Sequence, residues 1–401
     1  MKLLIICDII DLKYRKGITP TSWQLFKALH ETGNEVIIIP YLGEPIESLW
    51  WRTYPNPCTV ESKLYFSIVD KSQKQSIGNK GIFSTVSKSL IKNYIRPKWE
   101  NHLLKILDRE GDIDAVIFFH IPLNHFTGIP SRIKAKANLP VVCYDGDLPT
   151  SLPQYADYNA FIFDYYPGAD LSEYDAFLSS SKGAIPMLKE MGARNIHPFY
   201  YAVDPELYSP VQTEQDIDIF YYGHGDWAKE KRINYMVAKP SEQINKNFLV
   251  GGKHQVDLGN AKTCGFLPIS QWKLYCCRSK INLNITKEID AQTYATSSAR
   301  PFELASMGCC VVTDSYNGFE EWFEVGEEAF MANNENEAKE IYNVLLSSED
   351  LRRKTGEAAR RRVLKEHNML HRAKQMLSII EMINNSTFAE TNSQPFLEKR
   401  G

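Results

Sequence analysis

Residues 300–314 read Arg-Pro-Phe-Glu-Leu-Ala-Ser-Met-Gly-Cys-Cys-Val-Val-Thr-Asp and contain three structural signals in succession. Residues 302–307 form helices readily, Gly308 can adopt the left-handed conformation that ends a helix, and residues 309–312 are an apolar run typical of a buried strand. Just upstream, residues 281–286 alternate like a strand, so this helix begins beyond the carboxyl end of a strand. The stretch therefore predicts an αβ unit of a parallel sheet, at the edge where such sheets bind ligands.

Four short segments surround this predicted ligand site: Asn284-Ile285-Thr286-Lys287, Arg300-Pro301-Phe302-Glu303, Gly308 and Thr313-Asp314. Together they resemble the donor-site region of GT-B glycosyltransferases, in particular the spore-maturation-type (CgeB-like) branch related to the retaining family 4 enzymes. The resemblance implies that Glu303 holds the ribose hydroxyls of a nucleotide and that Lys287 and Arg300 hold its diphosphate. The side-chain chemistry agrees, because carboxylates accept hydroxyl hydrogen bonds and arginine suits phosphate. The alternative is an ordinary surface ion pair between Arg300 and Glu303, one helical turn apart.

The composition predicts a globular protein of two domains. The chain has 401 residues, of which 43% are hydrophobic and 24% charged, and this length exceeds one ordinary core. The formal net charge is -3, so no attraction to nucleic acid is expected and anion binding requires local basic clusters. The eight cysteines include two adjacent pairs and no C-x-x-C, which indicates reduced core residues of a cytoplasmic protein.

Membrane contact is predicted to be peripheral at most. The sequence contains no run of 18 apolar residues, which argues against a spanning helix. Residues 71–105 carry eight basic side chains against Glu100 alone, with aromatic residues between them. Such a segment can dock on the anionic inner face of a membrane, although a solvated helix with one face in the core is the simpler interpretation. Residues 45–80 are expected to be irregular.

The N-terminal half reads as a series of βα units whose strands end in polar residues. Residues 2–10, 22–32 and 35–40 predict a strand, a helix and a strand, and the resemblance places Gly17 of the intervening loop opposite the donor. Strands at 113–120 and 139–144 would point His120 and Asp145-Gly146-Asp147 into the cleft.

The resemblance implies that His120 contacts the sugar, with Asp147 beside it. A structural histidine is the alternative. An Asp-x-Asp metal site of the GT-A fold is disfavoured, because it would leave the C-terminal units without a role.

The boundary between the domains is placed at the proline-initiated polar segment after residue 209. Residues 1–210 are then an acceptor-side domain, residues 211–385 a nucleotide-sugar domain and residues 386–401 a polar tail. In the second domain a strand at 216–222 leads into Gly223-His224-Gly225, a pattern that can expose backbone N–H groups to a diphosphate.

Two further parts of the second domain match the family. By resemblance Arg232 binds the donor phosphates, and Gly265 and Phe266 belong to the loop that reads the nucleobase. The glycine pattern also allows an NAD-dependent oxidoreductase, but no acidic residue closes the second strand, residues 247–251.

The sequence departs from the family at one position. Where the retaining enzymes carry a second glutamate, eight residues before Glu303, this chain has Ala295. Contact with the donor sugar must then come from other loop residues, Glu288, Asp290 or Ser297 among them, or the activity differs.

We expect a GT-B fold of two Rossmann-like domains and a glycosyltransferase that needs neither metal nor cofactor. A nucleotide diphosphate sugar is the expected donor, and a glycan, lipid-linked or other molecule the acceptor. His120, Asp147, Lys287 and Arg300 are the catalytic candidates, and retention of configuration is implied by resemblance. A non-catalytic nucleotide-sugar or glycan-binding protein of the same fold is the alternative from another class.

Overall fold

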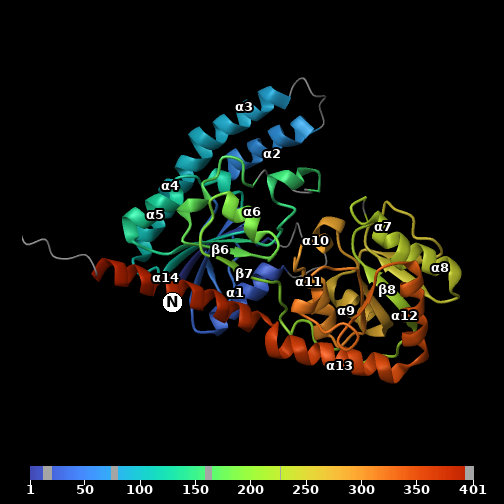
Figure 1. The fold of residues 1–401 in the computed structure, drawn as a ribbon. Coiled ribbons are helices and arrows are strands. Elements are labelled where there is room, and N and C mark those ends of the chain that lie inside the picture. Colours follow the sequence, from blue (N-terminus) through green and yellow to red (C-terminus); the bar gives the residue numbers. More distant parts are fainter. Residues whose placement is uncertain (12–19, 74–79, 159–164, 226, 393–401) are drawn as a thin grey trace, which may run out of the picture.

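The computed structural model describes residues 1–11, 20–73, 80–158, 165–225 and 227–392, and it forms two α/β lobes (Figure 1). The N-terminal lobe is built on a parallel sheet with the strand order β3-β2-β1-β4-β5-β6-β7. Its strands are β1 (Lys2–Ile9), β2 (Glu35–Leu42), β3 (Arg52–Thr53), β4 (Ala115–Phe119), β5 (Val141–Asp145), β6 (Ala176–Ser179) and β7 (Ile196–Pro198). Its helices are α1 (Thr21–Glu31), α2 (Thr59–Gln73), α3 (Lys80–Leu90), α4 (Arg96–Glu110), α5 (Ile129–Ala137) and α6 (Ile185–Glu190), and a π-helical turn, Ile91–Ile95, joins α3 to α4.

The C-terminal lobe repeats this plan with the strand order β10-β9-β8-β11-β12-β13. Its strands are β8 (Ile217–Tyr222), β9 (Phe248–Gly251), β10 (Lys262–Gly265), β11 (Ser279–Asn284), β12 (Val311–Asp314) and β13 (Phe330–Ala332). Its helices are α7 (Glu230–Ile233), α8 (Lys239–Gln243), α9 (Ile269–Arg278), α10 (Glu288–Gln292), α11 (Ala299–Ser306), α12 (Glu335–Ser347) and α13 (Glu349–Glu366). All strand pairs in both sheets are parallel, so their carboxyl ends lie at common edges.

The central strands are apolar on both faces because helices cover both sides of each sheet. In β1, Leu4 and Ile6 join the hydrophobic core on one face, whereas Leu3 and Ile5 join the core on the other. β8 behaves in the same way, since Phe220 and Tyr221 belong to opposite cores.

The stretch around Gly308 folds as its sequence predicts. α11 ends at Ser306, Gly308 has a φ of 72°, and β12 begins at Val311. The predicted strand before it is β11, and the loop between them contains the short helix α10.

One expectation about irregular structure is wrong, because residues 59–73 form α2 within the segment expected to be irregular. The helix α14 (Met369–Asn392) extends into the predicted polar tail. Residues 393–401 lie outside the described residues.

α14 also leaves the C-terminal lobe and runs along the N-terminal one (Figure 1). Its Met376 and Ile380 lie in the N-terminal hydrophobic core, and the helix packs against α1. The periodicity of residues 369–385 predicts a helix, but not which of two sheets buries it.

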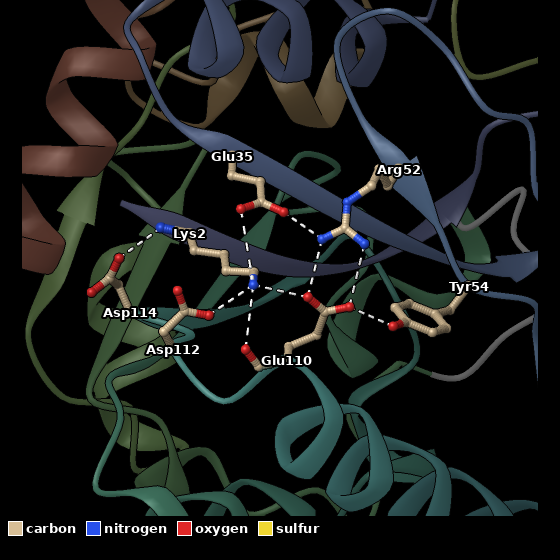
Figure 2. A network of polar contacts seen from close by, with 7 residues as sticks. All are labelled: Lys2, Glu35, Arg52, Tyr54, Glu110, Asp112 and Asp114. Atoms are coloured by element: carbon tan, nitrogen blue, oxygen red, sulfur yellow. Dashed lines mark hydrogen bonds and ion pairs between the residues drawn. The ribbon is translucent and has the colours of Figure 1, made fainter.

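A polar network ties the strands together at the amino edge of the N-terminal sheet, away from the predicted site (Figure 2). The Nζ atom of Lys2 lies 2.7 Å from Asp112 and 2.9 Å from Glu110. Arg52 pairs with both Glu35 and Glu110, so β1, β2, β3 and the end of α4 share one set of charges. Arg52, Tyr54 and Lys2 lower the pKa of Glu110 to about 2, and Arg52 is the largest cause.

None of the described helices combines the length and apolar character needed to cross a membrane.

Candidate functional site

His120 stands at the carboxyl end of β4 and is held between two carboxylates. Its backbone has a φ of 55°, a conformation that bends the chain out of the strand. The Nε2 atom lies 2.7 Å from Asp147 Oδ2, and Nδ1 lies 3.4 Å from Asp145 Oδ1. Burial alone would lower the pKa of His120, but Asp147 and Asp145 hold it well above its usual value. The two carboxylates therefore favour the protonated form of the ring.

Asp145 contacts both His120 and the backbone of Asp147 and so helps to position them. It is buried, and its carboxylate accepts hydrogen bonds from the hydroxyls of Ser151 and Tyr166 and from the Asp147 backbone. Burial opposes its charge, yet His120 and the two hydroxyls lower its pKa. With Asp145 fixed as an anion, Asp147 is the more accessible carboxylate, with 27% of its side chain exposed.

The C-terminal lobe presents Asp290 and Lys287 to the same region. Lys287 follows β11 and caps α10, which lies on the side of its lobe that faces the N-terminal lobe (Figure 1). The pKa of Asp290 is raised to about 6, chiefly by burial. Lys287 and Lys229 oppose this rise, whereas Asp147 adds to it. The carboxylates of Asp147 and Asp290, which belong to different lobes, therefore interact electrostatically.

Asp290 also has an unused hydrogen-bond acceptor. Its Oδ1 atom is buried and has no hydrogen-bond partner within the described part of the chain. A buried acceptor without a donor is costly, so a ligand hydroxyl that supplied one would bind favourably.

Arg232 lies behind this cluster and is already paired. Its NH1 atom is 2.8 Å from Asp314 Oδ2 and 2.7 Å from the carbonyl oxygen of Ser315. Asp314 also accepts from the backbone N–H of Thr286, which ties the end of β12 to the end of β11. Burial raises the pKa of Asp314 to about 6, against the opposing effect of Arg232. The Nε atom of Arg232 is buried with no partner among the described residues, so one donor remains for a ligand.

The lobes touch through the loop that carries Ala295 and Ser297. Ser297 Oγ donates to the carbonyl of Ser180 and accepts from the N–H of Tyr201, so this hydroxyl has a structural task. Ala295 is fully buried with a φ of 47°, and its carbonyl accepts from the N–H of Lys182. A glutamate there would bury its carboxylate, which explains the alanine.

Of the three residues expected to replace that glutamate, Asp290 fits best. Glu288 accepts from Gln292 on the outer side of α10 and lies 3.9 Å from Lys231.

Arg300 and Glu303 form an ion pair, but it lies neither on the surface nor in an open cleft. Arg300 NH1 is 3.2 Å from Glu303 Oε2, and Glu303 is only 4% exposed. The guanidinium stacks over the rings of Trp272, at 4.5 Å, and Tyr222, at 5.6 Å. Burial raises the pKa of Glu303, which Arg300 and Tyr208 partly oppose. Both sequence interpretations missed this aromatic enclosure, because Tyr222 and Trp272 come from distant segments.

The predicted base-binding loop lies next to that enclosure. The hydroxyl of Tyr222 donates to the carbonyl of Leu267 and accepts from the N–H of Leu267. These two bonds fix the loop after Gly265. Gly265 has a φ of 68°, and Phe266 is 59% exposed, with its ring 5.7 Å from that of His224. An exposed aromatic ring of this kind can stack on a nucleobase.

The glycine pattern at residues 223–225 does not form an open phosphate cradle. The N–H of Gly223 donates to Gly251, and that of Gly225 donates to Lys253. A Cβ at Gly225 would lie 2.4 Å from His254 Nδ1, so close packing requires this glycine. The expectation that these two N–H groups face a diphosphate is therefore wrong, and the oxidoreductase alternative loses its main support. Gly17 lies outside the described residues.

Comparison with known proteins identifies the fold. Residues 231–378 match the family described as "Glycosyl transferase-like". Sucrose-phosphate synthase from Thermosynechococcus elongatus superposes with a TM-score of 0.65 at 14% identity, over 96% of this chain and 99% of that one. The fold is GT-B.

Two further GT-B likenesses cover almost the whole chain. A glycosyltransferase from Rickettsia africae ESF-5 has a TM-score of 0.60 at 14% identity, over 95% of this chain and 98% of that one. The Anabaena protein HepE in complex with UDP-glucose has a TM-score of 0.58 at 11% identity, over 95% and 100% of the two chains. No curated protein sequence matches this chain significantly.

The GT-B fold excludes the GT-A alternative for Asp145-Gly146-Asp147. Asp147 pairs with His120 instead, and Asp145 is enclosed by hydrogen-bond donors. Within the described residues, no three His, Cys, Asp or Glu side chains gather as a metal site.

Proposed function

We propose that this protein is a glycosyltransferase that moves a sugar from a nucleotide diphosphate sugar to an acceptor. One observation carries the proposal: in a GT-B fold, Lys287 and Lys229 of one lobe and Asp147 of the other, which pairs with His120, all act electrostatically on the half-buried Asp290. The family match over residues 231–378 supports the same reaction.

A uridine nucleotide is the first donor to test. Several structures with this fold hold UDP or UDP-glucose, and HepE is among them. In our proposal Gly265 and Phe266 hold the base, Glu303 holds the ribose, and the sugar reaches Asp290. Gly223 keeps a steric role beside the diphosphate. A contact of Gly17 with the donor, from the N-terminal side of the site, stays a prediction.

Departure of the diphosphate is the costly step, because negative charge develops on its oxygens. Lys287, Arg300 and the free Nε donor of Arg232 can stabilise that charge without a metal ion. Protonated His120 adds positive charge from the acceptor side, and Asp147 fixes its orientation. Asp290 would accept a sugar hydroxyl in place of the glutamate that Ala295 replaces. We also propose that the sugar keeps its anomeric configuration, that the protein belongs to the CgeB-like branch and that it acts in the cytoplasm. These three points rest on the resemblance of residues 284–314 to that branch.

Turnover of UDP-glucose by the wild type and by Lys287→Ala tests the proposal. A charge-assisted hydrogen bond contributes roughly 1.5–3 kcal/mol, so the variant should lose about 10- to 150-fold in kcat/KM. Lys246→Ala is the matched control, because Lys246 is an exposed lysine of the same lobe, at the amino edge of its sheet. UDP release is measured in the presence and absence of EDTA, with other nucleotide sugars in parallel.

The outcomes separate the alternatives. UDP release that persists in EDTA and falls only in Lys287→Ala supports a metal-independent transferase. Tight binding of UDP-glucose without any release, across a panel of acceptors, would favour the non-catalytic binding protein instead. Equal loss in both lysine variants would remove Lys287 from the site.

A further inference from the structure

A cavity in the C-terminal lobe shares no lining residue with the proposed transferase site. It has a volume of about 800 Å³ and lies between the interdomain segment, the end of α9, the turn before β12 and the first half of α13. Cys277 and Cys309 both line it.

The two cysteines come from neighbouring elements and meet at the cavity wall. Cys277 is in the last turn of α9, and Cys309 follows Gly308 in the turn that leads to β12. The Sγ atom of Cys309 lies 3.7 Å from the carbonyl oxygen of Cys276, directly beside Cys277. Cys309 and Cys277 also interact electrostatically, so that the ionisation of each thiol depends on the other.

The surroundings of Cys277 favour a reactive sulfur. Its Sγ accepts from the backbone N–H of Val211 at 3.3 Å, and the side chain is only partly buried. Cys309, in contrast, is 6% exposed. One sulfur is thus open to a reagent in the cavity, and the other is held behind it.

We propose that Cys277 and Cys309 are a reactive thiol pair, which a hydroperoxide entering the cavity oxidises to an intramolecular disulfide. The Cys277 thiolate attacks the peroxide, the O–O bond breaks and hydroxide leaves, which gives a sulfenic acid at Cys277. The Cys309 sulfur then attacks that sulfur, its proton and the hydroxyl leave as water, and the S–S bond forms. Two thiols are oxidised while one hydroperoxide is reduced.

The ionisation of these thiols agrees with this order of attack. The hydrogen bond from Cys309 is the largest cause that lowers the pKa of Cys277, to about 7, and the Val211 N–H and Lys273 act in the same direction. The pKa of Cys309 is raised well above its usual value. Cys277 is therefore the nucleophile, because the thiolate is the reactive form.

Cys264 provides a matched control, since it is also partly buried and in the same lobe. Its pKa is raised, chiefly by burial. At neutral pH a much larger share of Cys277 than of Cys264 is therefore thiolate. Lower intrinsic nucleophilicity offsets part of that advantage, so Cys277 should still react with iodoacetamide at least about fivefold faster.

The test uses the full chain and mass spectrometry of its peptides. Iodoacetamide labelling is followed from pH 5.5 to 9, and separate samples receive hydrogen peroxide. We expect Cys277 to be labelled first, and peroxide to remove two hydrogens per chain in a peptide that joins Cys277 to Cys309. In Cys309→Ser the disulfide should be lost and the labelling midpoint of Cys277 should move to higher pH.

Three results would overturn the proposal. One is labelling of Cys264 as fast as that of Cys277, and another is peroxide oxidation that joins other cysteines or separate chains. The third is an unchanged labelling midpoint in Cys309→Ser, provided that circular dichroism shows a wild-type fold. Neither assay depends on a nucleotide sugar, so the result stands apart from the transferase proposal.

Discussion

Asp290 is the residue whose chemistry is least explained by the fold alone. Two lysines of its own lobe and Asp147 of the other act electrostatically on its side chain, and one of its oxygens is buried without a donor among the described residues. An ion pair kept only for stability would satisfy both oxygens. A ligand that brings hydroxyl donors into the interlobe region accounts for the vacancy.

Asp290→Asn should weaken catalysis and change its pH dependence. If ionised Asp290 accepts a sugar hydroxyl, the variant loses about 10- to 150-fold in kcat/KM, from roughly 1.5–3 kcal/mol per charged hydrogen bond. The pKa of about 6 means that wild-type activity should rise as the pH passes upward through about 6. This rise should be absent in the variant. The measurement is the pH profile of UDP release.

Glu288→Gln is the control for this comparison, because Glu288 lies two residues earlier on α10 and contacts Gln292 and Lys231. It should keep the wild-type profile. If Asp290→Asn retained both the rate and the rise near pH 6, the sugar contact would have to be sought elsewhere.

The residue scale also shows what the sequence could and could not predict. The sequence was sufficient to place Lys287, His120 and Asp147 at strand ends, because short apolar runs precede each of them. It could not predict that Glu303 is buried, since burial depends on Trp272 and Tyr222 from other elements. Nor could it show that the glycine N–H groups of residues 223–225 are already bonded.

At the scale of elements, α3 and α4 explain the basic segment better than the sequence could. The π-helical turn between them buries Ile91 and Ile95 in the N-terminal core, and α4 buries Trp99 there. This is the amphipathic helix that was the simpler interpretation. α2 escaped prediction because its periodicity is weak, so its helical state depends on packing against α3 (Figure 1).

The membrane prediction can now be narrowed to fewer side chains. Lys98 pairs with Glu61, and Arg96 donates to the carbonyl of Asn124, so these two are engaged within the lobe. Lys88 and Lys92 are exposed. Each charge near an anionic surface contributes on the order of 1 kcal/mol, so Lys88→Gln with Lys92→Gln should weaken vesicle binding about 10- to 30-fold.

Co-sedimentation with phosphatidylserine vesicles at low salt measures this effect. The control carries Lys246→Gln and Lys262→Gln, which removes two exposed lysines from the other lobe. Equal binding of the two double variants, or no binding by the wild type, would leave α3 and α4 as an ordinary part of the lobe.

At the scale of the whole molecule, the chain crosses between the lobes twice, and the crossings meet at His367. The N–H of Val203, in the first crossing, donates to the carbonyl of His367, where α13 ends and α14 begins. Arg372 of α14 donates to His367 Nδ1 and to the carbonyl of Tyr200. Sequence patterns predicted both sheets but not this junction, because its contacts join residues more than 160 positions apart.

Acid should destabilise the molecule through this junction. Burial, with Arg372 as the next cause, lowers the pKa of His367 to about 3, whereas an unfolded histidine titrates near 6.5. Between these values the unfolded chain binds the extra proton, so the free energy of unfolding falls as the pH falls. From pH 7 to pH 5 the loss from this one group is about 2 kcal/mol.

His367→Gln should remove that part of the pH dependence, since glutamine has no proton to gain and its amide oxygen can still accept from Arg372. Urea unfolding at pH 7 and pH 5 measures the difference for each protein. His125, whose pKa is also lowered to about 3 by burial, contributes equally to the wild type and the variant and cancels in the comparison. His30→Gln changes an exposed histidine in the last turn of α1 and should keep the wild-type difference. If His367→Gln lost as much stability between the two pH values as the wild type does, His367 would not be the group through which acid acts on the junction.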